Sequence, residues 1–385
     1  ALFSYVLVRA LLAECLRVVT QLLLLPLFFA PLLVAIGYLS LGSFEFMGHA
    51  PEQAALAQQY FIILIWGASF SLAKTVIASY FSGIGRTYIV MIADTAGVVI
   101  NIPLTWVLIF GYGDVPALGI AGAAYATVIS TLISLLIFCY FYLEPHHAAR
   151  FRVNESFHLD RGILRRFVRL GFPSGIEMFL NVAAFNLFLL MFQSYGIAES
   201  ASAAIVFNWD IVAYVPMIGL NVAIISLIGR YIGAGDSTLM NQVIRISFML
   251  GLGYSGVLAL SFYLGREPLV AIFLTTGGSR EIQTLASFMM IGLATYVMAD
   301  ATILVAGGVL RGAGDTRWLM WASVLIHWLM LLVQYFVIKV WALGPKVSWV
   351  VFVAMILITA LMYLLRLASS RWRTPEAFAR VMSEQ

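Results

Sequence analysis

Residues 282–316 read IQTLASFMMIGLATYVMADATILVAGGVLRGAGDT. The apolar run from 282 to 309 is long enough to cross the ~30 Å hydrocarbon core of a bilayer as an α-helix, which takes about 20 residues. Asp300 lies inside this run, where a charge costs at least ~2.5 kcal/mol at the bilayer centre. Such residues face a polar cavity, pair with another charge, or handle ions and protons. The run therefore predicts a membrane-spanning helix that carries a functional acid.

The rest of the chain repeats this apolar pattern. Of its 385 residues, 62% are apolar and 10% are charged, whereas soluble domains are about 45–50% apolar. Barrel strands would alternate apolar and polar residues over ~10 positions, but these runs are longer and continuous. We therefore predict an all-α, polytopic membrane protein without a sizeable soluble domain. Its spans are expected near 18–40, 57–82, 88–111, 118–143, 168–194, 201–229, 242–264, 282–309, 317–342 and 347–370.

Basic residues are distributed unevenly between the ends of these spans. Seventeen of the 22 Lys and Arg residues fall on one side, Lys74 lies inside a span, and the other side receives only Arg266, Arg280, Lys339 and Lys346. Because short loops rich in Lys and Arg stay in the cytoplasm, we expect a multi-pass protein of the inner (plasma) membrane with both termini cytoplasmic. The same distribution accounts for the net charge of +4 without a nucleic-acid partner.

A short motif recurs along the chain. The string Ser82-Gly83-Ile84-Gly85-Arg86-Thr87 is followed, 229 positions later, by Arg311-Gly312-Ala313-Gly314-Asp315-Thr316, in which the two glycines and the threonine recur at the same spacing. With this offset, four spans of the first half overlay four spans of the second, as in carriers built from repeats. We expect an N-terminal lobe at 1–143 with four spans, a cytoplasmic inter-lobe loop at 144–167, and a C-terminal lobe at 168–385 with six. The spans at 168–194 and 201–229 have no partner, so we expect two pseudo-symmetric six-helix lobes of which ten of twelve transmembrane helices are present.

Several strings occur in a characteristic order. They are Asn101-Ile102-Pro103-Leu104, Gly119-Ile120-Ala121-Gly122-Ala123-Ala124-Tyr125-Ala126-Thr127, Leu170-Gly171-Phe172-Pro173-Ser174-Gly175-Ile176-Glu177-Met178, Pro216-Met217-Ile218-Gly219, Gly229-Arg230-Tyr231-Ile232-Gly233-Ala234-Gly235-Asp236 and Gly308-Val309-Leu310-Arg311-Gly312-Ala313-Gly314-Asp315-Thr316. Together they resemble the multidrug and toxic compound extrusion (MATE) family over essentially the whole chain, from the third family helix to the twelfth. The resemblance implies a twelve-helix carrier with two lobes around a central cleft, which expels organic and often cationic compounds in exchange for Na⁺ or H⁺.

The resemblance also implies positions for a cation site. The family's acid on the tenth helix corresponds to Asp300, eleven residues before the Arg of the Leu-Arg-Gly string. On the seventh helix, a frequently acidic position four residues after the Pro corresponds to Glu177, whereas the often acidic position eight residues after the Pro is Asn181, a departure. In the first lobe, Asn101 matches a cation-binding Asn, but Thr105 stands where those members carry an Asp.

The residues themselves leave alternatives at each acid. Protonation and cation binding compete for one carboxylate, so Asp300 suits ion coupling, and the alternative is an Asp held by neighbouring hydroxyls such as that of Thr302. Glu177 and Asn181 lie one helical turn apart and could offer oxygen ligands to one hard cation. The alternative for Glu177 is a solvated position near the cytoplasmic headgroups.

The remaining intramembrane charges are less specific. Asp210 is interpreted as a cation or substrate ligand, or as an interfacial residue near the start of its span. For Lys74 and Asp94, in neighbouring spans, a mutual ion pair, or snorkelling of Lys74 towards a membrane edge, is favoured over a proton relay. Because aromatic rings bind cations and Met side chains adapt to varied ligands, four residues near the acids are candidates for the substrate cavity: Met178, Tyr214, Tyr296 and Met298.

We therefore expect a secondary active antiporter for multidrug efflux. It would work as a monomer in the lipid bilayer on small organic substrates, with Na⁺ or H⁺ as coupling ion and no other cofactor. The alternative is a flippase for a lipid-linked saccharide, which tends to have a basic cavity, whereas intramembrane charge here is mostly acidic. An enzyme would need a nucleophile with its base or a metal set, and the two cysteines, Cys15 and Cys139, are too few to build a metal cluster or a disulfide framework. The expected cation-coupling residues are Asp300, Glu177, Asn181, Asp210 and Asn101.

Overall fold

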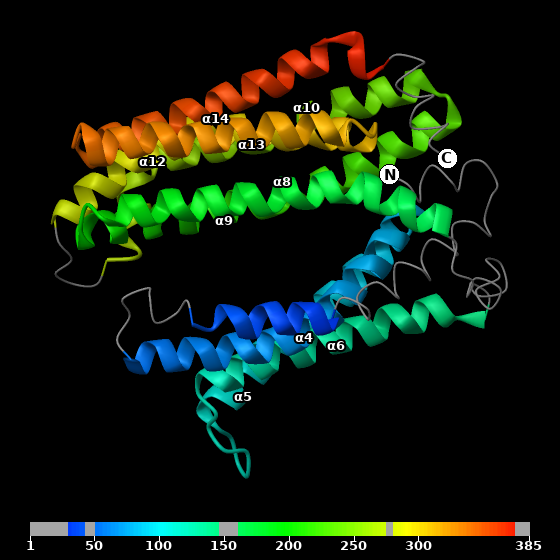
Figure 1. The fold of residues 1–385 in the computed structure, drawn as a ribbon, viewed down its shortest axis with the longest axis horizontal. Coiled ribbons are helices and arrows are strands. Elements are labelled where there is room, and N and C mark those ends of the chain that lie inside the picture. Colours follow the sequence, from blue (N-terminus) through cyan, green and yellow to red (C-terminus); the bar gives the residue numbers. More distant parts are fainter. Residues whose placement is uncertain (1–29, 43–50, 146–160, 275–279, 374–385) are drawn as a thin grey trace. The chain divides into compact units, whose positions relative to one another are not determined.

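The computed structural model describes residues 30–42, 51–145, 161–274 and 280–373. Within these ranges the chain is helical (Figure 1), and nine helices are long and apolar enough to cross a membrane. These nine correspond to the predicted spans from 57–82 onward. The predicted span at 18–40 falls mostly outside the described residues, and only the helix Ala30–Ser40 at its end is described. The prediction of an all-α, polytopic membrane protein is confirmed.

The chain forms two compact units, Leu2–Leu164 and Arg165–Gln385. In the first unit, α6 (Ile120–Leu143) packs against both α4 (Pro51–Gly83) and α5 (Thr87–Phe110). Small residues allow α5 and α6 to approach closely, because a Cβ at Gly122 would lie only 2.2 Å from the Leu108 carbonyl oxygen. Membrane helices commonly pack through such small residues, because the hydrophobic effect does not drive helices together within lipid.

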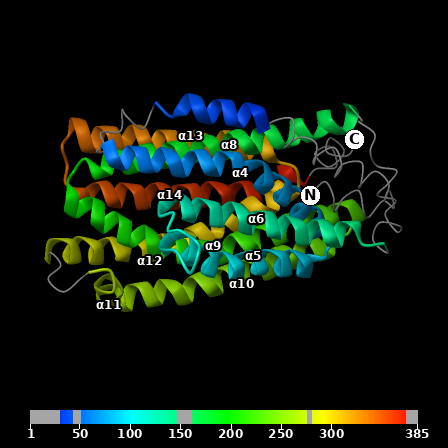
Figure 2. The same ribbon diagram turned by 90° about the horizontal axis from the view of Figure 1, so that it is seen from below.

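The second unit is a bundle of long helices that run side by side (Figures 1 and 2). Its elements are α8 (Arg161–Gln193), α9 (Ile197–Ala234), α10 (Ser237–Leu264), α11 (Arg266–Ala271), α12 (Arg280–Gly312), α13 (Thr316–Tyr335), the π-helical turn η2 (Phe336–Val340), α14 (Pro345–Ala368) and the 3₁₀ turn η3 (Ser370–Trp372). α8 begins at Arg161, so residues 161–167 are helical and do not belong to the loop predicted at 144–167.

α12 is the central helix of this unit. It packs against α9, α10 and α14, and it has a larger buried share than any other described span. Gly308 and Gly312, four residues apart, face α9, since added Cβ atoms would lie 2.9 Å from Asn221 Nδ2 and 3.0 Å from the Ile225 carbonyl oxygen respectively. The Asn221 side chain in turn donates a 2.5 Å hydrogen bond to the Leu304 carbonyl of α12. The glycines thus bring the backbones of α9 and α12 together.

The recurring sequence motif forms the same turn in both units. The α4–α5 turn has Gly85 at φ 80°, and the α12–α13 turn has Gly314 at φ 83°, both in the left-handed region that glycine adopts most readily. The amide that follows each glycine donates to a carbonyl five residues back: Arg86 to Phe81 and Asp315 to Leu310, both at 2.9 Å. This is the hydrogen bond that closes a Schellman helix end. The sequence repeat is therefore also a structural repeat.

An aromatic cluster ties α14 to α8, α9 and α12. The Phe352 ring stacks on Phe188 with 4.8 Å between centroids and meets Phe207 edge-to-face at 6.0 Å. The Trp349 indole donates a 3.0 Å hydrogen bond to the Met289 carbonyl, and its ring lies 6.2 Å from that of Tyr296. Because these rings are fixed from several helices, they form a rigid wall.

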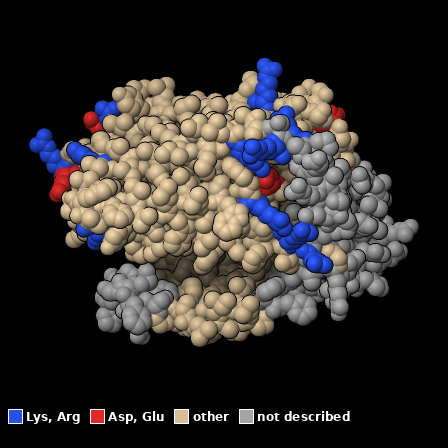
Figure 3. All heavy atoms as spheres, turned by 45° about the horizontal axis from the view of Figure 1, so that its top comes forward, with Lys and Arg blue, Asp and Glu red and all other residues tan. Residues whose placement is uncertain are grey.

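The exposed charged side chains are unevenly distributed over the described surface. Figure 3 shows Lys, Arg, Asp and Glu gathered towards the ends of the described surface, with a broad uncharged band between them in this view. Such a band is what a lipid-facing surface requires, since charges within hydrocarbon are costly.

Candidate functional site

A cavity of about 460 Å³ lies within the second unit. Five helices, α8, α9, α12, α13 and α14, contribute to its lining, which is mostly apolar and aromatic. The ionisable side chains in it, apart from tyrosines, are Glu177, Asp210, Asp300, Arg311 and His327. The cavity therefore brings together the three acids expected within the spans of the second half, although they come from three different helices.

α12 supplies the acid at the centre of the prediction, Asp300. Tyr296, one helical turn earlier, faces the same cavity. None of the described residues donates a hydrogen bond to the Asp300 carboxylate. The Thr302 hydroxyl instead donates to the Met298 carbonyl at 2.9 Å, so the alternative of an Asp held by this hydroxyl is wrong. The carboxylate is left open to the cavity.

α9 supplies the second acid, Asp210. Asp210 lies about 20 Å from the start of α9 at Ile197, and its side chain lines the cavity. Asp210 Oδ1 and the Tyr296 hydroxyl are both buried without a hydrogen bond of normal geometry among the described residues. The side chains of Asp210, Tyr296 and Asp300 all line the same cavity. Two ionised carboxylates repel each other at such a site, so a cation or a proton there would stabilise the pair.

α8 supplies the third acid, Glu177. The structure pairs it with a base, which the sequence analysis did not predict. Glu177 is 2% exposed and accepts a 2.6 Å ion-pair hydrogen bond from the Arg311 guanidinium. It is therefore not a solvated residue near the headgroups. The Arg311 side chain passes over Gly307, where an added Cβ would lie 3.2 Å from Arg311 Nη1 and 3.2 Å from the Tyr363 ring. Glu177 Oε2 is buried and has no hydrogen-bond partner among the described residues.

Asn181 lies one turn after Glu177 and also reaches the cavity. Its amide nitrogen donates a 2.6 Å hydrogen bond to the Ser323 hydroxyl of α13, which fixes the orientation of the amide. Its oxygen, Oδ1, is buried and makes no hydrogen bond to the described residues. Glu177 Oε2 and Asn181 Oδ1 are thus two free oxygens on one helix, and the predicted shared cation ligation has the oxygens that it needs.

The other predicted lining residues are placed as follows. Met178, Tyr214 and Tyr296 line the cavity. Met298 does not line it and is 41% exposed, because two residues of helix turn its side chain to the face opposite Asp300. His327 also lines the cavity, with Nδ1 2.7 Å from the Ser323 carbonyl oxygen.

The candidate in the first unit has different surroundings. The Asn101 side chain on α5 donates a 3.1 Å hydrogen bond to the Ser130 hydroxyl of α6. Lys74 and Asp94 form an ion pair with 2.8 Å between Nζ and Oδ1, which confirms the interpretation favoured for them. The three acids of the second unit line one cavity, whereas Asn101 lies in the first unit.

A family model named MatE matches residues 15–107 and 173–336. These two segments cover about two thirds of the chain. The chain belongs to the MATE family. Both segments contain motif strings identified in the sequence, and the MATE match in the second segment includes the three cavity acids and Arg311. Members of this family are transporters.

Solved MATE structures share the fold of this chain. A MOP superfamily transporter from Pyrococcus furiosus, described for the reverse polarity of its binding pocket, is 18% identical with a TM-score of 0.84, covering 99% of this chain and 83% of its own. A MATE structure in complex with MaL6 is 19% identical with a TM-score of 0.82, covering 95% and 83% respectively. An outward-facing multidrug resistance MATE family transporter is 19% identical with a TM-score of 0.80, covering 95% and 82%.

Proposed function

We propose that this chain exports organic cations in exchange for Na⁺ or H⁺, and that cargo and coupling ion compete for the acids of the second-unit cavity. The observation that carries the proposal is the charge of this cavity. Three carboxylates face it, and the one guanidinium is already paired with Glu177. Asp210 and Asp300 remain without a basic partner among the described residues, so the cavity favours a positively charged occupant.

The size and lining of the cavity support an organic cargo. Its volume of about 460 Å³ lies within the range of ~300–1,000 Å³ typical of small-molecule sites. Phe185, Phe207 and Phe352 contribute aromatic surface, to which cations bind with ~0.5–2 kcal/mol per contact. Met178 and Met355 add flexible apolar surface, which suits cargoes of different shapes.

The coupling ion can be either a proton or Na⁺ on this chemistry. A proton needs only a carboxylate, and Asp300 has no competing hydrogen bond among the described residues. A hard cation such as Na⁺ prefers several oxygen ligands, and the buried free oxygens of Asp210, Asn181 and Glu177 are available. In both cases ion binding neutralises the acids, weakens cargo binding and releases the cargo. Alternating access would then come from the two lobes moving against each other, in a monomer of the plasma membrane with both termini cytoplasmic.

The charge of the cavity does not favour the flippase alternative. A lipid-linked saccharide carries phosphates, which need several free basic groups, whereas Arg311 is the one Lys or Arg among the lining residues and is already paired. The test of the proposed function therefore includes a lipid-flipping assay beside the efflux assay.

Transport in proteoliposomes with separately imposed Na⁺ and pH gradients tests the proposed function. We expect gradient-driven movement of a fluorescent organic cation, and a loss of about tenfold or more for Asp300→Asn. Asp236→Asn is the matched control, because it makes the same change at the N-cap of α10, where Asn caps as well as Asp. Wild-type transport by Asp300→Asn, or saccharide-lipid flipping without cation transport, would contradict the proposal.

A further inference from the structure

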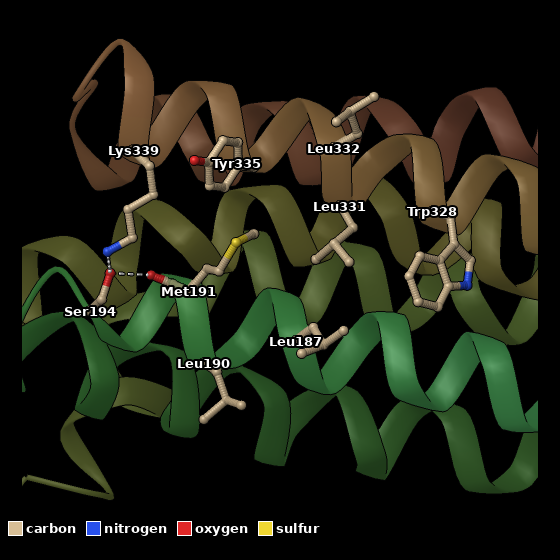
Figure 4. Close-up of a pocket in the computed structure, with 9 residues that line it drawn as sticks. All are labelled: Leu187, Leu190, Met191, Ser194, Trp328, Leu331, Leu332, Tyr335 and Lys339. Carbon is tan, nitrogen blue, oxygen red and sulfur yellow. Dashed lines mark hydrogen bonds between the residues drawn. The ribbon is translucent and has the colours of Figure 1, made fainter. Parts of the chain in front are cut away.

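A second hollow in this unit has a different chemistry. It is an open groove of about 470 Å³ between α8 and the segment formed by α13 and η2 (Figure 4). Its walls are apolar, with Leu187, Leu190 and Met191 on one side and Trp328, Leu331 and Leu332 on the other. It shares no lining residue with the acidic cavity. Since several of its side chains are widely exposed, the groove presents an apolar surface rather than a closed core.

The charged group of the groove lies at one end. There the Lys339 ammonium donates a 2.9 Å hydrogen bond to the Ser194 hydroxyl, which itself donates to the Met191 carbonyl at 2.7 Å (Figure 4). An ammonium has three donors, so two remain for another acceptor. Lys339 forms no ion pair with a described carboxylate. It lies in the π-helical turn η2, a geometry that occurs frequently at functional sites.

The length of the groove matches one leaflet of a bilayer. Trp328 and Lys339 are eleven residues apart on the same helical segment, which corresponds to about 16 Å at 1.5 Å per residue. This is about half of the ~30 Å hydrocarbon core. Lys339 is the next-to-last residue of its span, so we expect its ammonium near the headgroups and the apolar part of the groove among the acyl chains.

The positive charge of Lys339 determines which kind of ligand the groove favours. Organic cations are disfavoured because the free ammonium repels them, and an uncharged chain would leave its two donors unused. A lipid phosphate satisfies both donors while its acyl chain covers the apolar walls. We propose that this groove binds an anionic glycerophospholipid of the adjoining leaflet, with its phosphate at Lys339 and one acyl chain between α8 and α13.

Lipid retention by the purified full chain tests this proposal independently of transport. The protein is equilibrated with phosphatidylglycerol or phosphatidylcholine of identical acyl chains, and native mass spectrometry counts the lipids that remain bound. One Lys near a membrane surface contributes about 1 kcal/mol of attraction to anionic lipid, so we expect about fivefold preferential retention of one phosphatidylglycerol.

Two variants separate the headgroup from the acyl-chain contact. Lys339→Gln should lower phosphatidylglycerol retention to the level of phosphatidylcholine. Leu190→Trp should reduce retention of both lipids, because Leu190 is 53% exposed in the groove and a larger ring there fills the space of the acyl chain. Its exposure also means that this change does not overpack the core.

Lys346→Gln is the matched control for charge. Lys346 is the second residue of α14, and its ammonium lies 5.5 Å from the centre of the Phe288 ring rather than in the groove. We expect this variant to retain phosphatidylglycerol as the wild type does. Equal losses for Lys339→Gln and Lys346→Gln would indicate general surface attraction and overturn the proposal, as would wild-type retention by Lys339→Gln or Leu190→Trp.

Discussion

The four acids predicted to lie within the spans, Asp94, Glu177, Asp210 and Asp300, fall into two groups. Lys74 pairs with Asp94, and Arg311 pairs with Glu177, so each of these pairs is close to neutral. Asp210 and Asp300 have no basic partner among the described residues. An isolated charge in the bilayer is costly. Ion pairing accounts for the charges of the two pairs, whereas the two unpaired acids indicate a functional role.

The Arg311–Glu177 pair gives a prediction about stability. Arg311→Gln should lower the free energy of unfolding by about 3 kcal/mol, since it leaves a buried carboxylate without its partner. The double variant Glu177→Gln/Arg311→Gln should recover most of this loss, because neither charge remains. Thermal unfolding in detergent, read by intrinsic fluorescence, measures both. If the double variant is no more stable than Arg311→Gln alone, the pair is not the source of the loss.

Hydropathy and spacing identified Asp210, Asp300 and Glu177 as unusual residues, but not all of their contacts. The Arg311 partner of Glu177 lies 134 residues away in the sequence, and its position at a helix end resembles an ordinary topology signal. Gly307 leaves room for the Arg311 side chain to reach Glu177, because an added Cβ would lie 3.2 Å from Arg311 Nη1. Helical periodicity could have excluded Met298 from the cavity, because it lies two residues from Asp300 on the opposite face.

At the level of helices, glycines determine where the acids meet. Gly308 and Gly312 allow the close approach of α12 to α9, and this contact sets the relative position of the helices that carry Asp300 and Asp210. Glycines also end these helices. Gly235 at the end of α9 has a left-handed φ of 72°, and Gly314 in the α12–α13 turn has a left-handed φ of 83°. Local sequence therefore encodes both the packing and the ends of these helices.

Gly312→Ala tests the contact between α9 and α12. The added Cβ would lie 2.8 Å from Ile228 Cβ and 3.0 Å from the Ile225 carbonyl oxygen, and the backbone atom cannot move aside easily. We expect a loss of about 1–3 kcal/mol in the free energy of unfolding. Gly253→Ala on α10, which would meet nothing within 4 Å, should be neutral or slightly stabilising. Equal effects of the two changes in thermal unfolding would count against close packing at Gly312.

The helices extend beyond the apolar runs that predicted them. α4 begins at Pro51 and α9 at Ile197, several residues before the predicted starts at 57 and 201. Hydropathy detects only the part of a helix that lies in hydrocarbon, whereas the backbone stays helical until a capping residue ends it. The predicted starts therefore mark the beginnings of the apolar runs and not those of the helices.

At the level of the molecule, the sequence repeat correctly predicted a repeated structure in the two units. The two glycine turns have matching hydrogen bonds 229 positions apart, and the family match spans both units. What the sequence could not provide is the cavity itself, because its five helices are brought together by contacts between residues that are far apart in the chain. The whole proposed function depends on this convergence of acids from separate helices.

The most direct test of the central claim is equilibrium binding of tetraphenylphosphonium to the purified protein. Binding is measured by isothermal titration while Na⁺ concentration and pH are varied separately. We predict that raising one of the two ions, Na⁺ or H⁺, weakens wild-type binding about tenfold or more. Asp300→Asn should bind the cation at least about tenfold more weakly, by ~1.4 kcal/mol, and lose the response to that ion. If Asp300→Asn binds with unchanged affinity and unchanged competition, the cavity is not the site at which cargo and ion exchange.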